Sequence, residues 1–244
     1  MTTATRAIRL TGTATVVRFN WPKYLGVLAL AAAAGAACLA GAPTPACALA
    51  CAACAPAITW TVASLAATWW VYDHRRVYEL LTAGLADAGN WAVVHAGFDE
   101  SVPALRNAIG RPPAAVAEIA VRPGPTLRRA RRRNQRAVAG VPVNDLPLGA
   151  GSLDSVFVTF ASHEVRDLDD QRALFSSLRR ALRPGGRLII TEHPRDAANV
   201  AVYGPGALHF QPLATWHARA AEAGLSAESR LRITPFVQRV VYQR

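Results

Sequence analysis

The sequence predicts an α/β domain built on a mostly parallel sheet and preceded by a hairpin of two apolar helices. Three observations lead to this prediction. A strand–helix–strand pattern fills residues 154–193, two uncharged runs lie within residues 24–72, and two alternating polar and apolar segments end the chain. The 244 residues suffice for one such domain and an appendage.

The strand–helix–strand pattern of residues 154–193 begins with a run of β-branched and aromatic residues, typical of a buried strand. Leu174, Leu178 and Leu182 then recur every four residues along a helix whose first turn is acidic, as the helix dipole favours. A Pro-Gly-Gly turn separates this helix from a second apolar strand. A unit of this length joins parallel strands by a right-handed crossover.

The N-terminal third divides into a basic tail, residues 1–23, and a hairpin, residues 24–72. Its two uncharged runs, 24–42 and 46–72, are each long enough to cross a bilayer, which takes about 20 residues. The second run ends in Trp and Tyr next to basic residues, as at a membrane–water interface. Because basic residues flank only the outer ends, the pattern predicts two spans, with the N-terminus and the C-terminal domain, 73–244, in the cytoplasm.

Two alternatives remain for this region. Residues 1–50 could be a cleaved signal peptide ending at the small residues ACALA, or the Ala-rich first run could be an interfacial helix. All four cysteines lie here, and the pattern does not indicate a disulfide scaffold. Cys47, Cys51 and Cys54 share one helix face, which favours a helix–helix seam over a metal site because no fourth ligand follows at zinc spacing.

The sequence of the C-terminal domain, residues 73–244, predicts a regular succession of helices and strands. A strand pair closes it, and an amphipathic helix with Trp216 on its apolar face precedes that pair. The elements expected before the crossover unit are an amphipathic helix over 73–90, a strand and loop over 91–101, a second strand over 114–121 and a third strand with its exit loop over 141–148.

The densest charge cluster of the chain runs from Arg128 to Arg136 on an expected helix. Such a helix suits anionic lipid headgroups, which attract basic residues by about 1 kcal/mol each. Nucleic acid is not an expected partner, because no aromatic residues interleave with the arginines to stack on bases. A solvated basic helix is an equal alternative to lipid binding.

Two segments around the crossover resemble a known family. LPLGAGSLDSVFVTFASHEV and LFSSLRRALRPGGRLIITE resemble the second half of class I S-adenosylmethionine-dependent methyltransferases. The shared features are the Leu146-Pro147 turn, Asp154 opening the fourth strand, and Arg-x-Leu-x-Pro-Gly-Gly from Arg180 to Gly186. The segments HE-x-R, from His163 to Arg166, and TEH-x-RD, from Thr191 to Asp196, also resemble a membrane-attached branch of this family. The resemblance implies a Rossmann-like sheet with an antiparallel edge hairpin and S-adenosylmethionine as the cofactor.

The family binds its cofactor at the ends of the first three strands. The positions that the resemblance assigns to the first loop are His95, Ala96, Gly97 and Asp99. This loop departs from the family pattern, because it has one glycine instead of three and His95 in place of an acid. For the ribose the resemblance offers Glu118, which is expected in the middle of the second strand, and for the adenine it offers Asn144 or Asp145.

Two pairs of titratable residues follow the strands of the crossover unit: His163 with Glu164, and Glu192 with His193. Ligands of open α/β sheets bind at the carboxyl ends of the strands, so we expect these four residues to line a methyl-acceptor pocket. One of them would take a proton from the acceptor, while positioning contributes most of the rate.

Two other hypotheses concern the same residues. They could bind a divalent metal for hydrolysis, although the prediction favours no resident metal, or they could pair with Arg166 and Arg195 in a non-catalytic membrane scaffold. The favoured function is methyl transfer from S-adenosylmethionine to a small or lipid-like, membrane-associated acceptor. The alternative is a methyltransferase fold whose cofactor site has degenerated.

Overall fold

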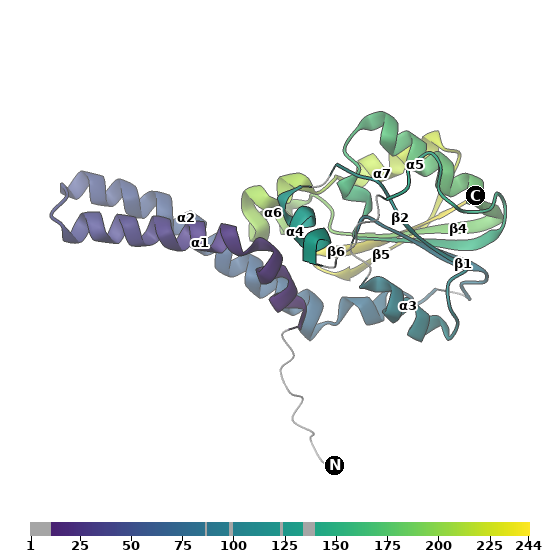
Figure 1. Ribbon diagram of the computed structural model, residues 1–244, viewed down its shortest axis with the longest axis horizontal. Helices are drawn as coiled ribbons and strands as arrows, with labels where there is room; N and C mark the ends of the chain where they lie inside the picture. Colours follow the sequence, from purple (N-terminus) through teal and green to yellow (C-terminus); the bar gives the residue numbers. More distant parts are fainter. Residues whose placement is uncertain (1–10, 86, 98–99, 123, 134–139) are drawn as a thin grey trace, which may run out of the picture.

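The computed structural model describes residues 11–85, 87–97, 100–122, 124–133 and 140–244. Two of the predicted site positions, Asp99 and Arg136, lie outside these residues, as do the side chains of Arg131, Arg132 and Arg133. A sheet domain forms one end of the molecule, and a long helical hairpin projects from it (Figure 1).

The hairpin consists of α1 (Thr11–Leu39) and α2 (Thr44–Thr68), which continues into the π-helical turn η1 (Trp69–His74). The first helix begins within the expected tail, so residues 11–23 are helical. The segments Gly12–Leu39 and Thr44–His74 are long and apolar enough to cross a membrane. Their most apolar windows are 0% and 6% buried within the structure.

Both ends of the hairpin are tied. At its tip Cys38 and Cys47 form a disulfide, with their Cα atoms 5.5 Å apart. Cys47 therefore lies where the two helices meet, as expected, but its sulfur is bonded to Cys38 and does not simply pack there. At the base, the Asp73 carboxylate accepts hydrogen bonds from the backbone nitrogens of Gly12 and Thr13, at 2.7 and 2.8 Å, and from the Thr13 hydroxyl. Asp73 thus caps the first turn of α1 from the end of α2.

The chain enters the domain through a turn. Arg76 adopts a left-handed backbone conformation, with φ 52°, and this ends the helical path of α2. A short 3₁₀ helix, η2 (Val77–Leu80), and further turns follow. The amphipathic helix expected over residues 73–90 is therefore broken at Arg76.

Six strands form one sheet in the order β2-β1-β3-β4-β6-β5. Their bounds are β1 (Trp91–His95), β2 (Ala115–Glu118), β3 (Leu153–Thr159), β4 (Leu182–Glu192), β5 (Ser226–Thr234) and β6 (Val237–Gln243). The first four are parallel, and β6 pairs antiparallel with both β4 and β5. This arrangement confirms the predicted parallel sheet with an antiparallel edge. Because β2 and β3 lie on opposite sides of β1, the sheet has a topological switch point at β1.

The third strand expected over residues 141–148 does not form. Only an isolated bridge joins Val141 to Ile119, just beyond the end of β2. The chain turns directly after this bridge, since a hydrogen bond from Asp145 N to the Pro142 carbonyl closes a turn.

Helices cover both faces of the sheet (Figure 1). Strand residues alternate between two core clusters: Val156 and Val158 face α5 (Leu168–Ala181) and α7 (Leu213–Glu222), whereas Phe157 faces α3 (Ser101–Ile109) and the turns after η2. The remaining elements are α4 (Pro125–Arg133), η3 (Ser162–Glu164), α6 (Ala197–Tyr203) and η4 (Gly204–His209).

The segment α6–η4 lies between the sheet and α2 (Figure 1). Gly204, with φ 53°, packs against the indole of Trp60, and a Cβ atom at this position would lie 2.5 Å from the ring. On the other side of the hairpin base, α4 contacts α1: Arg129 donates to the Phe19 carbonyl, and the Thr126 hydroxyl donates to Asn20.

The Asp73 cap provides a test of how the hairpin is held. We expect Asp73→Ala to destabilise the protein by about 1 kcal/mol, within the range for lost helix caps, because three donors of α1 lose their acceptor. Thermal unfolding of the full chain in neutral detergent measures this loss, and Asp87→Ala, which removes a carboxylate 79% exposed, serves as the control. Equal stability of the two variants would contradict the cap.

Candidate functional site

The cofactor positions that the resemblance assigned meet at the carboxyl ends of β1 and β2. His95 is the last residue of β1 and pairs in register with Glu118, the last residue of β2. The expectation that Glu118 lies in mid-strand is wrong, because β2 stops after four residues. A carboxylate at the end of the second strand suits the hydroxyl groups of a ribose, which donate hydrogen bonds to it.

The turn after β1 is tight. Gly97 has a φ of 110°, a conformation that side chains disfavour, and Ala96 before it is buried. The Gly97 N–H donates to Nδ1 of His95 at 3.1 Å, so His95 stabilises the loop from within. A glycine turn beside a strand-end carboxylate fits an adenosine-type cofactor, even though this loop has a single glycine.

The adenine-side candidates lie next to Glu118. Backbone hydrogen bonds join Val141 to Glu118 and Ala120, and the exposed residues Asn144 and Asp145 follow this bridge. Although the third strand is missing, the bridge still brings both residues to the carboxyl edge of the sheet.

The acid–base candidates meet at the ends of β3 and β4. Glu192 is fully buried, and its Oε1 accepts hydrogen bonds from the backbone N and the hydroxyl of Ser162, at 2.7 and 2.9 Å. Its Oε2 lies 2.8 Å from Nδ1 of His163, which donates to it. Buried carboxylates need such partners, because desolvation of the charge is costly. The four polar residues thus include one tight carboxylate–imidazole pair.

The charge of Glu192 controls the titration of His163. Burial lowers the pKa of His163, but the adjacent carboxylate outweighs burial and holds the pKa above its usual 6.5. Conversely, burial raises the pKa of Glu192, but His163 and the Ser162 hydrogen bond lower it overall. Since Nδ1 serves Glu192, Nε2 of His163 is the nitrogen that can accept a proton, and Oε1 of Glu164 lies 3.6 Å from it.

His193 occupies a different environment from that of His163. Its Nδ1 donates to the Phe236 carbonyl at 2.9 Å, and its Nε2 therefore accepts from the Tyr72 hydroxyl at 3.0 Å. Burial lowers the pKa of His193 to about 4, so the ring is neutral near pH 7. Both ring nitrogens are engaged, and one of their partners comes from the end of the α2 helical path.

Aromatic rings surround His193. It lies between Phe160 and Phe210, with ring centroids 5.1 and 5.2 Å away, and Tyr203 contacts its edge. Phe160 has a φ of 50°, which is strained for a bulky residue and is often found where a structure constrains a site. Its position just after β3 directs its ring toward His193 and Tyr72.

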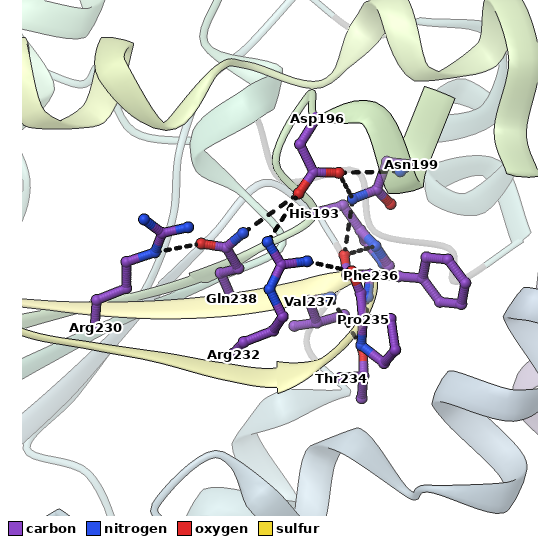
Figure 2. A network of polar contacts seen from close by, with 10 residues as sticks. All are labelled: His193, Asp196, Asn199, Arg230, Arg232, Thr234, Pro235, Phe236, Val237 and Gln238. Carbon is purple, nitrogen blue, oxygen red and sulfur yellow. Dashed lines mark hydrogen bonds and ion pairs between the residues drawn. The ribbon is translucent and has the colours of Figure 1, made fainter. Parts of the chain in front are cut away.

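A polar network joins this edge to the β5–β6 turn (Figure 2). The Asp196 carboxylate caps α6 by accepting from Asn199 N and contacts Arg232 and Gln238 on the two edge strands. The Phe236 carbonyl accepts from both His193 and Asn199. The network holds the start of α6 against the end of the sheet.

Two hollows border the domain. A pocket of about 230 Å³ lies at the carboxyl edge, with His163, Arg166, Arg195 and His209 in its wall. A larger cleft of about 1030 Å³ lies between the C-terminal ends of α5 and α7, away from the predicted site; its wall contains Arg172, Arg179, Arg180, Arg219, Glu222 and Arg244. Several of these arginines already have partners, such as Glu222 and backbone carbonyls.

The structure also bears on the other two hypotheses. No ion pair joins Arg166 or Arg195 to any carboxylate in the described part of the chain, so the loop-pinning pairs of the scaffold hypothesis do not form there. Within the same residues, no group of three or more His, Cys, Asp and Glu is arranged to hold a metal ion.

Several residues of this edge were not predicted from the sequence, among them Tyr72, Ser162 and Phe210. Ser162 stands beside His163 at a strand end, and that position is a usable signal. Tyr72 and Phe210 reach the edge only through the packing of the hairpin and of η4, for which no local pattern exists.

Comparisons with known proteins agree with this geometry. Residues 107–190 match the family model of a methyltransferase domain. The pyocyanin biosynthetic protein PhzM has a TM-score of 0.58 at 16% identity, over 98% of this chain and 74% of that one. At such identity the likeness shows the fold.

Two further structures are similar at lower scores. A SAM-dependent methyltransferase from Aquifex aeolicus has a TM-score of 0.49 at 18% identity, over 71% of this chain and 92% of that one. Geranyl diphosphate C-methyltransferase from Streptomyces coelicolor A3(2) has a TM-score of 0.48 at 15% identity, over 70% and 79%. No curated protein matches the chain significantly.

The matched segment contains β2, β3, α5 and most of β4, and therefore includes the motifs on which the resemblance rests. Residues 107–190 thus belong to a methyltransferase domain, and the shared fold agrees with the resemblance to class I, S-adenosylmethionine-dependent methyltransferases.

Proposed function

We propose that the protein transfers a methyl group from S-adenosylmethionine to a small, lipid-like acceptor at the membrane surface. The observation that carries this proposal is the pairing of His163 with Glu192 at the carboxyl ends of β3 and β4. The pair lies on the same edge of the sheet as His95 and Glu118, where the fold binds its cofactor.

The residues for the cofactor follow from their positions. Glu118 would accept hydrogen bonds from the ribose, the turn at Ala96 and Gly97 would allow close approach, and Asn144 or Asp145 would contact the adenine. His95 supports that turn through its contact with Gly97. When bound, S-adenosylmethionine supplies a methyl group that is attached to a positively charged sulfur. The sulfur keeps the electron pair of the broken carbon–sulfur bond and becomes neutral.

The acid–base role falls to His163. Glu192 holds the tautomer in which Nδ1 carries the proton, so Nε2 can take a proton from an acceptor in the adjoining pocket. The buried carboxylate then stabilises the imidazolium, and Glu164 lies near enough to add to that effect. His193 is given a structural role and no role in proton transfer. Its two ring nitrogens hydrogen-bond to Tyr72 and to the Phe236 carbonyl, and these bonds orient Tyr72 and the β5–β6 turn.

Membrane attachment is supported by three features of the hairpin. Its apolar windows are exposed, its basic residues lie toward the base, and α4 contacts α1 beside that base through Arg129, where lipid headgroups would lie. The Cys38–Cys47 disulfide at the tip suits an oxidising compartment. Charge and disulfide therefore favour the same topology, with the N-terminus and the catalytic domain in the cytoplasm.

The same contacts favour a retained first helix over a cleaved signal peptide. Removal of residues 1–50 would take away the partner of Asp73 and both cysteines of the disulfide. We infer that α1 is an integral part of the folded protein.

Cofactor binding separates catalysis from the alternative of a degenerate site. Glu118→Ala should weaken S-adenosylmethionine binding tenfold or more in calorimetry of the full chain, because a charged acceptor of hydrogen bonds is lost. Glu228→Ala, which removes a carboxylate from the exposed edge strand β5, is the matched control. If the unmodified protein does not bind the cofactor, the degenerate-site alternative replaces this proposal.

The role of His163 predicts a pH dependence. Since its pKa lies above 6.5, His163 is protonated at lower pH and cannot accept a proton, so methyl transfer should rise as pH rises through that pKa. The rate at each pH is measured as the transfer of a labelled methyl group into the lipid extract of membranes that contain the protein. His163→Gln should lower the rate about a hundredfold and flatten the profile, with cofactor affinity unchanged. An unaltered profile would exclude His163 as the base.

The topology can be tested at the hairpin tip. In a variant that carries Cys51→Ala and Cys54→Ala, an impermeant maleimide added to intact cells should label Cys38 and Cys47 only after reduction of the disulfide. Labelling that requires cell lysis would place the tip in the cytoplasm and reverse the orientation.

A further inference from the structure

The pocket beside His163 has a positively charged rim. Arg166, two residues after η3, and Arg195, three residues after β4, both line it and are exposed. Neither is ion-paired to a carboxylate of the described residues. The guanidinium of Arg195 has one recorded contact, to the Leu208 carbonyl at 3.5 Å, the outer limit of a hydrogen bond.

The nearby carboxylates are engaged elsewhere. Glu192 is held by His163 and Ser162, and Asp196 is directed toward the N-terminus of α6 and the edge strands (Figure 2). Glu164 lies next to Nε2 of His163. Two guanidinium groups at the mouth of one pocket, with no counterion among the described residues, match a phosphate or carboxylate, which arginine binds through paired hydrogen bonds.

The other side of the same pocket is apolar. Leu208, on η4, is 65% exposed, and Phe210 lies next to it in the pocket wall. The segment that carries Leu208 rests on α2 through Gly204 and Trp60. An apolar chain that leaves the pocket past Leu208 would therefore meet the exposed apolar surface of the hairpin.

The volume of the pocket limits what it encloses. About 230 Å³ is below the range of roughly 300–1,000 Å³ for sites that enclose a whole ligand. The pocket suits a headgroup, while a longer chain would remain outside along the hairpin.

We propose that the methyl acceptor is an anionic amphiphile, with its phosphate or carboxylate between Arg166 and Arg195 and its chain against Leu208 and Phe210. This inference rests on the proposed function and adds the chemical class of the acceptor. It places the group to be methylated within reach of His163, close to the anionic group.

Binding of model amphiphiles tests this inference without knowledge of the acceptor. The full chain in neutral detergent micelles is titrated with octyl phosphate, octanoate, inorganic phosphate and octyl glucoside, with empty micelles as the blank. We expect octyl phosphate or octanoate to bind at least tenfold more tightly than both inorganic phosphate and octyl glucoside. The double variant Arg166→Gln, Arg195→Gln should lose this preference.

The control variant is Arg172→Gln with Arg180→Gln, which removes the same charge from the cleft at the opposite edge. The inference is overturned if octyl glucoside binds as well as the anionic amphiphiles, if inorganic phosphate alone accounts for the affinity, or if both double variants behave alike. Binding of S-adenosylmethionine is measured in the same samples. A protein that binds the cofactor but no anionic amphiphile loses only this inference, whereas one that binds the amphiphile but no cofactor loses the proposed function.

Discussion

The buried carboxylate of Glu192 determines the arrangement of the edge that we propose as the active site. The side chain has no solvent-exposed surface, so its charge depends on hydrogen bonds from Ser162 and His163. These partners come from the 3₁₀ turn after β3, while Glu192 itself ends β4. The two neighbouring strands are thus joined at their ends by one charged group. The same contact sets the tautomer of His163 and raises its pKa, and His163 itself lines the pocket.

The domain and the hairpin meet at this edge, so they are parts of one site. Tyr72 reaches His193 from the end of the α2 path, and the segment that forms the pocket wall packs on Trp60. The pocket wall comes from the domain alone, and the segment that carries Leu208 joins it to the hairpin through Gly204 and Trp60. A lipid-like acceptor of the proposed kind would therefore have a short route from the hairpin surface to His163.

The sequence predicted those parts of the fold that depend on local patterns. The crossover from β3 through α5 to β4 follows from strand periodicity, leucine spacing and a Pro-Gly-Gly turn, and its strand ends placed His163 and Glu192 together. The third strand failed because the turn between Pro142 and Asp145 outweighs a short apolar run. Glu118 was misplaced by a few residues, within the ordinary uncertainty of strand ends.

Other contacts had no local signal. The hydrogen bond between Tyr72 and His193 joins residues 121 positions apart, and Asp73 reaches Gly12 over 61 positions. Both depend on how the hairpin docks, which depends on packing between elements and on the left-handed turn at Arg76. The scaffold hypothesis pairs Arg166 and Arg195 with carboxylates that pin loops. Only the three-dimensional structure shows that the carboxylates near them contact other groups.

The hairpin is closed covalently at the tip and by Asp73 at the base, so its two helices cannot slide past one another. In the proposed membrane-spanning arrangement, a bilayer thinner than its apolar length would favour a tilt of the two helices as one unit. A tilt of that unit moves Tyr72 and Trp60 together, and with them the hydrogen bond to His193 and the support of the pocket wall. Bilayer thickness would then act on the shape of the site, and the lipid composition around the enzyme becomes one of the variables that set its rate.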